Sequence, residues 1–366
     1  MTGRTIMIMA GGTGGHIYPA ISVAEVLREQ GWTIVWLGSK AGMEARIVPP
    51  HGYVMAWIRF SGLRGKGLLR TVMLPLNLLI AFWQSARAIF IHRPDVVLGM
   101  GGYVAFPGGM VASLLKRPLV IHEQNSVAGL TNRVLARLAD KVLVAFPDAF
   151  KKVFKNKYLP LWVGNPVRAD IGAMEAPAVR YGARHARQAS LQLLVLGGSL
   201  GASILNTTLP KALALLPAAT RPRVTHQSGA AHIDALRAAY AAAGVQAETL
   251  PFLDDMAARY AHADLVICRA GASTIAEIAA AGVASVLVPL PSAVDDHQTH
   301  NARFLSGRGA AVLIPQAEFT PEKLAQLVQG LTRDQLIEMA QAARAAAKPD
   351  ATNAVANVCM ELANAT

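Results

Sequence analysis

The feature that most restricts the fold of this chain is an apolar run of strand length that leads directly into a glycine-rich turn. Residues 4–10 form such a run, and Gly11-Gly12-Thr13-Gly14-Gly15-His16 follows. A helical pattern comes next, with Pro19 in its first turn and Gly31 as a stop signal. A short apolar run without alternation is typical of a parallel strand buried on both faces. These residues therefore predict a β/α unit.

The same pattern recurs along the chain. Helix-length segments separate the further strand-like runs, which favours parallel sheets covered by helices on both faces. These runs are Thr33–Leu37, Asp95–Leu98, Leu119–Ile121, Lys141–Ala145, Leu191–Leu196, Arg223–His226, Asp264–Cys268 and Ala284–Val288.

A bridge rich in proline and basic residues at 151–168 divides these runs into two groups. We therefore predict an α/β fold of two doubly wound, Rossmann-like parallel-sheet domains facing a central cleft. The expected boundaries are 1–163 and 164–340, with a terminal helical segment at 341–366 that packs back across the junction onto the first domain. The Ala-rich tail from Asp334 to Ala363 reads as helix. A ligand would lie at the carboxyl ends of the strands.

Three more glycine-rich turns follow strand-like runs, at residues 99–102, 197–201 and 269–274. Glycine at a strand-to-helix turn lets backbone N–H groups approach a phosphate, and the helix N-terminus favours its negative charge. None of the turns matches the P-loop pattern, and Ile17 occupies the third glycine of a dinucleotide fingerprint. Four such turns predict a nucleotide-diphosphate ligand.

The positive charge of the chain lies in one half. Of 366 residues, 35 are Lys or Arg and 23 are Asp or Glu, a net charge of +12. Residues 1–165 hold 19 basic and 7 acidic side chains, whereas residues 166–366 hold 16 of each. A basic half favours a polyanionic partner, although it could also be a surface that only aids solubility. The sequence has no RNA- or DNA-binding motif, so we expect no nucleic-acid partner.

One uncharged stretch, residues 71–83, could be mistaken for a membrane span. It is 13 residues long and contains Pro75, whereas a spanning helix needs about 20 residues. Apolar groups flanked by basic ones suit a surface on anionic lipid, or equally a buried helix with snorkelling ends. We expect no transmembrane span and no signal peptide. The flanking basic residues are Arg59, Arg64, Lys66, Arg70, Arg87 and Arg93.

His16 is the first candidate for acid–base chemistry, because it directly follows a phosphate-type turn and imidazole titrates near neutral pH. The polar run at 122–126 follows another strand, so we expect its side chains to face the cleft. His297 and His300 lie close to two aspartates but lack a third ligand cluster. Cys268 and Cys359 follow no metal or redox spacing. We therefore expect no metal and no cofactor.

Several strings, spread in order over nearly the whole chain, resemble the MurG family of bacterial N-acetylglucosaminyltransferases. The resemblance implies a GT-B fold, a UDP-N-acetylglucosamine donor and a polyprenyl-diphosphate-linked muramyl-pentapeptide acceptor, lipid I, which becomes lipid II for peptidoglycan. It implies a peripheral location on the cytoplasmic face of the inner membrane, among anionic lipids and other cell-wall synthesis proteins. The matching strings are GGTGGHIYPA (11–20), SGLRGKG (61–67), PDVVLGMGGYVAFPGG (94–109), HEQNSVAGLTNR (122–133), VGNPVR (163–168), GGSLGA (197–202), FLDDM (252–256), CRAGASTIAEIAAAG (268–282) and HQTHNA (297–302).

The resemblance also implies which residues bind the donor. Ser199 and the backbone of residues 272–274 would hold the diphosphate, and Glu277 would hold the ribose hydroxyls. The backbone of Leu253 would hold the uracil end together with Arg168.

The sugar and the acceptor are assigned in the same way. Gln298 would contact sugar hydroxyls, and Asn125 would reach over from the first domain. Thr13, Gly14 and Gly15 would either face the donor diphosphate or hold the diphosphate of the acceptor. The complete expected set is Thr13, Gly14, Gly15, Asn125, Arg168, Ser199, Leu253, Ala272, Ser273, Thr274, Ile275, Ala276, Glu277 and Gln298.

Two positions depart from the family pattern. Leu200 stands where glutamine is common, and Ala270 stands where serine is frequent. Neither change removes a backbone donor, so we expect the activity to be retained.

The implied reaction is a single displacement with inversion, in which the acceptor C4 hydroxyl attacks the anomeric carbon and UDP leaves. His16 is the candidate general base, with Glu123 and Tyr103 as alternatives. Helix N-termini, backbone amides and hydroxyls would stabilise the leaving diphosphate in place of a metal.

Two other functions compete with this one. Another enzyme of the same fold, such as a diacylglycerol glycosyltransferase or a UDP-sugar epimerase, would share the glycine turns but gives no reason for the HEQN and GLRGKG strings. A nucleic-acid-binding protein would account for the charge alone.

Overall fold

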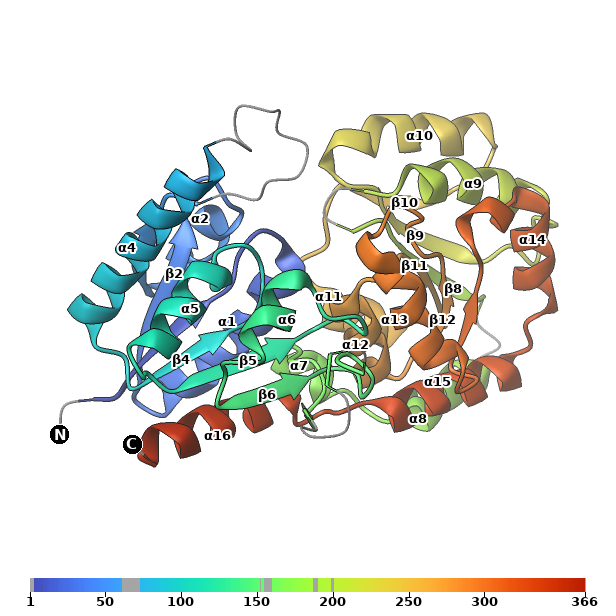
Figure 1. The fold of residues 1–366 in the computed structure, drawn as a ribbon. Coiled ribbons are helices and arrows are strands. Elements are labelled where there is room, and N and C mark those ends of the chain that lie inside the picture. The colour runs from blue at the N-terminus through green and yellow to red at the C-terminus, as the bar shows by residue number, and fades with distance from the viewer. Residues whose placement is uncertain are drawn as a thin grey trace. The chain divides into compact units, whose positions relative to one another are not determined.

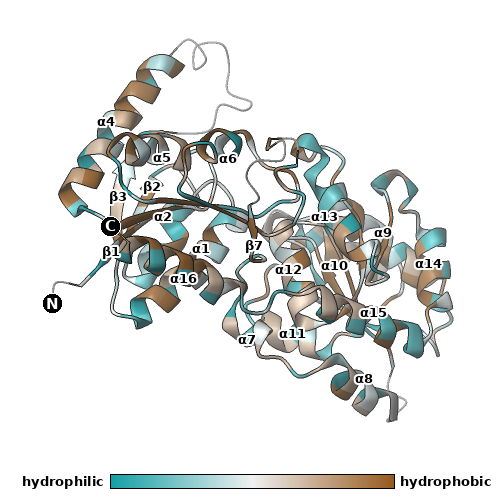
Figure 2. Cartoon of the chain, turned by 60° about the horizontal axis from the view of Figure 1, so that its bottom comes forward, coloured by the Kyte–Doolittle hydropathy of each residue, from teal (hydrophilic) through white to brown (hydrophobic). Residues whose placement is uncertain are grey.

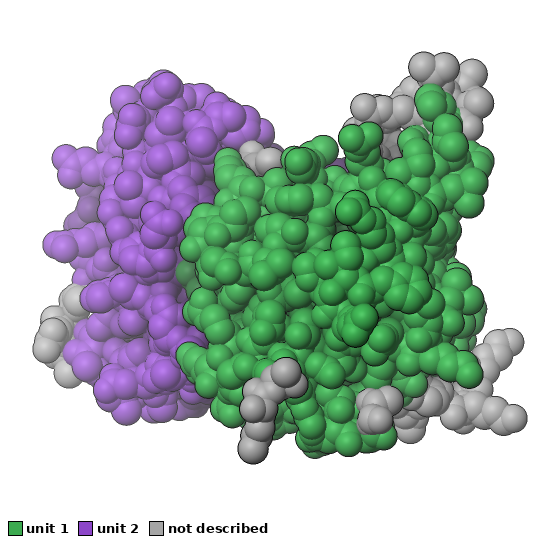
Figure 3. All heavy atoms as spheres, turned by 90° about the vertical axis from the view of Figure 1, so that its left-hand side faces the viewer, with its two compact units in different colours: residues 1–168, 348–366 green, residues 169–347 purple. Residues whose placement is uncertain are grey.

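The computed structural model describes residues 3–60, 73–151, 153–154, 160–186, 190–198 and 201–365. It divides into two compact units, shown in separate colours in Figure 3. The first unit comprises Met1–Arg168 and Lys348–Thr366, and the second comprises Ala169–Ala347. The chain therefore leaves the first unit and returns to it at its end.

The first unit is built on a sheet whose described strands all run parallel, in the order β3-β2-β1-β4-β5-β6-β7 (Figure 1). Its centre is β1, which pairs with β2 on one side and β4 on the other. The strands are β1 (Thr5–Met9), β2 (Thr33–Ser39), β3 (Val54–Ile58), β4 (Val96–Gly99), β5 (Leu119–Glu123), β6 (Lys141–Val144) and β7 (Leu161–Trp162).

The second unit repeats this plan with a sheet of order β10-β9-β8-β11-β12-β13, also parallel. The strands are β8 (Gln192–Leu196), β9 (Arg223–Gln227), β10 (Glu248–Leu250), β11 (Leu265–Cys268), β12 (Ala284–Leu287) and β13 (Ala311–Leu313). Two parallel, doubly wound sheets are the architecture that the sequence predicts, so that prediction is confirmed.

Helices connect the strands of each sheet, as a parallel order requires. The first unit contains α1 (Gly14–Glu29), α2 (Glu44–Ile47), the 3-10 turn η1 (Pro49–His51), α4 (Leu74–His92), α5 (Ala105–Leu114), α6 (Leu130–Leu135) and α16 (Ala351–Asn364). The second contains α7 (Ala169–Gly172), α8 (Pro177–Ala186), α9 (Ser203–Ala214), η2 (Ala230–His232), α10 (Ile233–Ala242), α11 (Met256–His262), α12 (Ala272–Ala281), η3 (Val294–Asp296), α13 (His297–Ser306), η4 (Gln316–Glu318), α14 (Pro321–Gly330) and α15 (Arg333–Ala346).

The four strands that the sequence reading missed are the edge strands of the two sheets, β3, β7, β10 and β13. β7 is exposed at both of its residues, and β10 contains no fully buried residue. An edge strand has one neighbour and less cover than a central strand, so it does not need a continuous apolar run. The central strands carry that run because helices cover both of their faces.

The Ala-rich tail forms two helices where we expected one. α15 ends at Ala346 and α16 begins at Ala351, with Pro349 between them. Proline cannot donate the backbone hydrogen bond that a continuous helix needs there, and it disfavours helical geometry at the preceding residue. α15 belongs to the second unit and runs through position 341, where we expected the terminal segment to begin.

The last helix is part of the core of the first unit. Val355, Ala356 and Cys359 of α16 are completely buried in one cluster with Ile6 and Ile8 of β1. Burying an aliphatic side chain contributes about 1.5–3 kcal/mol. The first sheet therefore depends on residues from both ends of the chain.

α4 combines a buried face with an exposed apolar face. Ala81, Ser85, Ala88 and Ile89 are buried, and the last two join the core on the other side of the first sheet. Among the described residues, this helix alone is long and apolar enough to cross a membrane by length and composition, with a mean hydropathy of 1.4. The apolar helix extends to His92, well beyond the 13-residue stretch considered from sequence. Brown dominates its ribbon in Figure 2.

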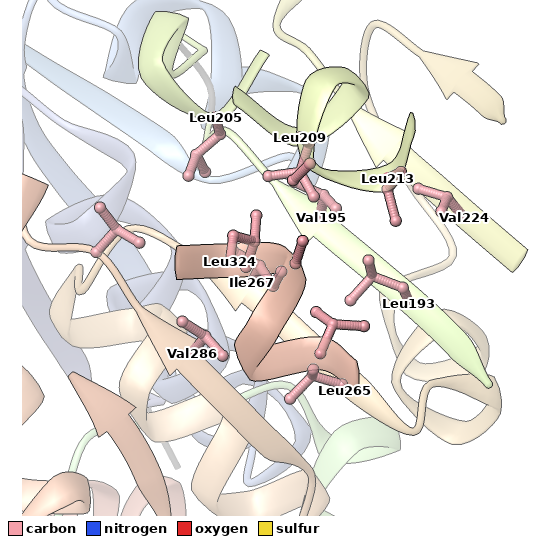
Figure 4. Close-up of a cluster of buried hydrophobic side chains, with 14 of the residues drawn as sticks. Leu193, Val195, Leu205, Leu209, Leu213, Val224, Leu265, Ile267, Val286 and Leu324 are labelled. Atoms are coloured by element: carbon pink, nitrogen blue, oxygen red, sulfur yellow. The ribbon is translucent and has the colours of Figure 1, made fainter. Parts of the chain in front are cut away.

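The core of the second unit lies between its sheet and the helices that cover it. Leu205, Leu209 and Leu213 of α9 lie over Leu193 and Val195 of β8, as Figure 4 shows. The side chains at positions 205, 209 and 213 recur every four residues, so they fall on one face of the helix. That face is what fixes α9 against the sheet.

Two histidines are buried in the neutral form. His226 lies with Nδ1 2.9 Å from the Tyr240 hydroxyl and Nε2 3.0 Å from Asn206 Oδ1. Because an amide oxygen only accepts, Nε2 carries the proton and Tyr240 donates to Nδ1. Burial lowers the pKa of His226 to about 3 and that of His122 to about 4, from 6.5.

Acid should therefore destabilise the fold before carboxylates titrate. Below pH 6.5 the unfolded chain takes up protons that these two buried histidines cannot, so stability present above that pH is lost as the pH falls. Each histidine should cost about 1.4 kcal/mol per pH unit. Denaturant unfolding between pH 7 and 5 checks this. In His226→Gln the loss over the same interval should be smaller, and an equal loss in both proteins would contradict the assignment.

Candidate functional site

The glycine-rich turns follow neighbouring strands in pairs. The strand order of the first sheet reverses between β1 and β4, and the turns at 11–15 and 99–102 follow these two neighbouring strands. The turns at 197–201 and 269–274 follow β8 and β11 in the same way. A Cβ atom at Gly102 would collide with the backbone of Gly11, so the first pair is in direct contact. Ligands of doubly wound sheets bind at such reversal points.

His16 lies in the first turn of α1 and is held by Gln124. Its Nδ1 atom is 3.1 Å from Gln124 Oε1, and Gln124 Nε2 donates to the Met100 carbonyl over 2.7 Å. The second bond fixes which end of the amide faces His16. Because an amide oxygen only accepts, the His16 proton lies on Nδ1, and Nε2 keeps its lone pair. The imidazole is therefore set to accept a proton at Nε2.

Gly101 allows this arrangement. A Cβ atom there would lie 2.9 Å from His16 Nδ1, and the backbone has φ = 94°, in the left-handed region that favours glycine. Any other residue at this position would displace the imidazole.

Three of the polar residues at 122–126, which we expected to face the cleft, are instead buried. His122, Glu123 and Gln124 are all at most 2% exposed. Position at a strand end does not force exposure, because the following loop folds back over them and supplies hydrogen-bond donors. His122 Nε2 lies 2.9 Å from the Gly164 carbonyl, to which it donates.

Glu123 anchors that loop. Its Oε1 accepts from the backbone N–H and side-chain amide of Asn125, at 2.9 and 3.3 Å. Its Oε2 accepts from the Gly129 N–H at 3.2 Å and from Asn132 Nδ2 at 2.9 Å. Both carboxylate oxygens are therefore engaged by the loop.

Tyr103 lies against the first glycine turn. A ring carbon is 3.3 Å from the position that a Cβ atom of Gly12 would take, and the side chain is half-buried. Burial, followed by the charge of Glu44, raises the pKa of Tyr103 above 10. The hydroxyl therefore stays protonated at neutral pH, where it can donate a hydrogen bond but does not act as a base.

Of the remaining first-unit candidates, three lie at the start of α1 and one lies at the end of the unit's first segment. Thr13 is exposed and is the N-terminal cap residue, and Gly14 and Gly15 form the first turn with His16. Arg168 is the last residue before the second unit begins.

The second-unit candidates lie mainly on α12. Ala272, Ser273, Thr274, Ile275 and Ala276 form its first turn and a half, behind the cap residue Gly271. Glu277 follows on the same helix and is partly buried. Its Oε2 accepts from the Tyr260 hydroxyl at 3.1 Å.

Two other predicted positions flank that helix. Leu253 is buried just after β10, and Gln298 lies in the first turn of α13, where its Oε1 accepts from the Leu290 N–H at 3.0 Å. Ser199 and Leu200 lie outside the described residues, as does the GLRGKG string.

Sequence reasoning missed residues that hold the turns from behind. Gln124 is one of them, and Gln227 is another. Gln227 Oε1 accepts a hydrogen bond from the Gly198 N–H at 3.1 Å, and its Nε2 donates to the Gly198 carbonyl at 3.0 Å. Arg269 donates to the carbonyls of Val288 and Pro289 at 3.1 Å each. The available signal was a polar residue at the end of a buried strand, and it does not specify which turn the side chain supports.

No group of three or more potential metal ligands occurs within the described part of the chain. His297 donates to the Val294 carbonyl over 2.7 Å, within its own loop. The described residues therefore offer no cluster that would hold a divalent ion.

Two doubly wound parallel sheets, each with glycine-rich turns after the strands at which its order reverses, are typical of the GT-B fold. The chain belongs to glycosyltransferase family 28, whose N-terminal domain matches residues 6–144 and whose C-terminal domain matches residues 192–355.

Close relatives carry one name. The chain is 62% identical over 360 residues to the UDP-N-acetylglucosamine–N-acetylmuramyl-(pentapeptide) pyrophosphoryl-undecaprenol N-acetylglucosamine transferase of Aromatoleum aromaticum, covering 98% of both chains. The protein of that name from Cupriavidus metallidurans is 60% identical over 363 residues, with 99% of each chain covered.

Solved structures agree. The crystal structure of MurG from Acinetobacter baumannii matches with a TM-score of 0.84 at 42% identity, over 98% of this chain and 99% of that one. A putative UDP-N-acetylglucosamine 2-epimerase from Listeria monocytogenes shares the fold alone, with a TM-score of 0.68 at 14% identity over 100% and 98% of the two chains.

Replacing Gln124 should slow turnover through His16. Gln124→Leu removes the acceptor of the Nδ1 proton, so the imidazole loses its fixed orientation, and kcat should fall about tenfold or more. The affinity for the nucleotide should change little. Gln30→Leu, at the exposed end of α1, is the matched control.

Steady-state kinetics of the single and double variants check the route. Because Gln124 acts through His16, Gln124→Leu should add little in a His16→Ala background. Full additivity of the two changes would show that Gln124 acts on something else.

Proposed function

We propose that this chain transfers N-acetylglucosamine from UDP-N-acetylglucosamine to the C4 hydroxyl of the muramyl unit of undecaprenyl-diphosphate-linked muramyl-pentapeptide. The product is lipid II, which is used for peptidoglycan synthesis. The observation that carries the proposal is the name shared by relatives about 60% identical to this chain along nearly its whole length. The HEQN string and the four glycine turns support the same activity.

The chemistry is one displacement at the anomeric carbon, with inversion. The acceptor oxygen forms a bond to that carbon as the bond to the UDP oxygen breaks, and the C4 hydroxyl proton moves to His16 Nε2. The hydrogen bond from Nδ1 to Gln124 stabilises the imidazolium that forms. Positioned general-base catalysis contributes about 100–10,000-fold. We prefer His16 to the two alternatives. Both carboxylate oxygens of Glu123 already accept hydrogen bonds, and the Tyr103 hydroxyl stays protonated at neutral pH.

The second requirement of the reaction is that the negative charge on the leaving diphosphate is stabilised. The backbone N–H groups of the first turn of α12 point out of the helix N-terminus, and Ser273 and Thr274 add hydroxyls in the same turn. Such dipoles stabilise negative charge without reorganisation. We assign this turn to the donor diphosphate and Glu277 to the ribose hydroxyls.

The other contacts follow the family resemblance. Leu253 meets the uracil through its backbone, and Gln298 meets the sugar. Thr13, Gly14 and Gly15 hold the acceptor diphosphate in this proposal. The roles of Ser199, Asn125 and Arg168 stay predictions from the resemblance.

We also propose that the protein lies on the cytoplasmic face of the inner membrane and binds it peripherally through α4. Large apolar side chains stand exposed along this helix, opposite the face that enters the core. Their exposed fractions are Leu76 52%, Leu79 65%, Trp83 64%, Phe90 63% and Ile91 59%. An apolar stripe beside basic residues suits the boundary between headgroups and acyl chains. A helix with one face in a protein core lies along that boundary and does not cross it.

Transfer of radiolabelled N-acetylglucosamine to a soluble lipid I analogue tests the activity. Wild-type protein should transfer from UDP-N-acetylglucosamine and retain its rate in EDTA, because backbone dipoles carry the diphosphate charge. His16→Ala should lower kcat about 100-fold or more while the affinity for UDP changes little. Turnover with UDP-glucose alone would point to another enzyme of the fold, and a strict need for added magnesium would overturn the metal-free mechanism.

Polar substitutions on α4 should weaken membrane binding. Leu79→Gln, Trp83→Gln and Phe90→Gln together remove most of the exposed apolar area, so sedimentation with vesicles containing anionic lipid should drop severalfold. Transfer to a soluble acceptor should be retained. Leu114→Gln, 75% exposed at the end of α5, is the control. Unchanged sedimentation of the triple variant would rule out this surface.

A further inference from the structure

A buried carboxylate lies directly beneath the first glycine turn. Glu44 begins α2 and is 0% exposed. Its Oε2 accepts from the Gly12 N–H at 3.1 Å, and its Oε1 accepts from the Ser39 N–H, in the last residue of β2, at 3.0 Å. Burying a carboxylate is costly unless hydrogen bonds compensate it. The Glu44 carboxylate is therefore the acceptor for two backbone N–H groups, those of Gly12 and Ser39.

Glycines shape the space around this carboxylate. A Cβ atom at Gly11 would lie 2.7 Å from Glu44 Oε1, and one at Gly38 would lie 2.9 Å from Glu44 Cγ. A Cβ atom at Gly42 would collide with both carboxylate oxygens. Three separate segments thus omit a side chain where Glu44 lies. The Glu44 side chain fills the space that a side chain at Gly11, Gly38 or Gly42 would need.

The same carboxylate reaches Tyr103. Burial and then the nearby charge of Glu44 raise the pKa of the Tyr103 hydroxyl. The ring of Tyr103 in turn lies against Gly12. One side chain therefore joins the glycine turn, the end of β2 and the tyrosine that stands beside the turn.

The orientation of the Gly12 peptide is what these bonds control. Gly12 has φ = 88°, and a glycine in a turn otherwise has wide conformational freedom. Because the Gly12 N–H donates to Glu44, the peptide between Gly11 and Gly12 is held in one orientation. Fixing the turn before binding lowers the entropic cost of binding.

We propose that Glu44 is a positioning residue for acceptor recognition, which holds the 11–15 turn and Tyr103 in the geometry that receives the acceptor diphosphate. The inference rests on the proposed function, since it takes this turn as the acceptor's half of the site. Glu44 itself touches no substrate and acts through Gly12 and Tyr103.

Glu44→Gln tests the proposal with almost no change of volume. A glutamine has one acceptor oxygen, so one of the two backbone N–H groups faces an amide donor and the turn loses a bond. A hydrogen bond to a charged group lost here corresponds to about a tenfold change or more. The KM for a soluble lipid I analogue should rise by that factor, and the KM for UDP-N-acetylglucosamine and the binding of UDP should stay unchanged.

A second variant covers the case in which Glu44→Gln folds poorly. Gly42→Ala keeps the charge but displaces the carboxylate from the other side, and should give the same split between the two KM values. Glu29→Gln, at the exposed end of α1, is the control and should change neither. In the double variant of Glu44→Gln with Tyr103→Phe, the effects on acceptor kcat/KM should be less than additive.

The outcomes separate the two proposals. Unchanged acceptor KM in both variants, or equal changes for donor and acceptor, would overturn the role of Glu44 while wild-type transfer upholds the function. Absence of transfer by the wild-type protein itself would overturn the proposed function.

Discussion

The rest of the structure depends on the burial of parallel strands on both faces. Such a strand carries apolar side chains throughout, so chemistry can be placed only where it ends. In both sheets the order of strands reverses once, between β1 and β4 and between β8 and β11. The turns after these strands are rich in glycine, which lets the backbone approach a bound phosphate closely. The position of the candidate sites follows from this layering before any catalytic residue is considered.

Polar side chains that never meet solvent hold these turns in place. Gln124 fixes the tautomer of His16, Gln227 brackets Gly198, and Glu44 binds the Gly12 amide. Each is nearly or wholly buried, and its polar atoms form hydrogen bonds with the backbone or, for Gln124, also with the catalytic candidate His16. A site built from glycine has little rigidity of its own, because glycine loses the most freedom on ordering. The supporting side chains supply that rigidity.

The sequence predicts an interior strand correctly where burial alone decides which amino acids the strand contains. The central strands were found because they are continuous apolar runs, and β7 and β10 were missed because an edge strand tolerates exposure. Glu123, which we expected to face the cleft, is buried, since a loop that folds back can satisfy a carboxylate as well as water does. Glu44 gave no signal in the sequence, because its partners Gly12 and Ser39 are backbone donors that any residue could supply.

The sequence by itself determined the layered α/β architecture, the glycine turns at strand ends and the family. These properties depend on local period and on short strings that the chain displays directly. Tertiary structure alone decided which residues of α16 enter the core beside β1, that one face of α4 stays exposed, and which nitrogen of His16 is left to accept a proton. Each of these depends on contacts between residues far apart in the chain, and a hydrogen bond or a buried face exists only once the chain has brought both partners together.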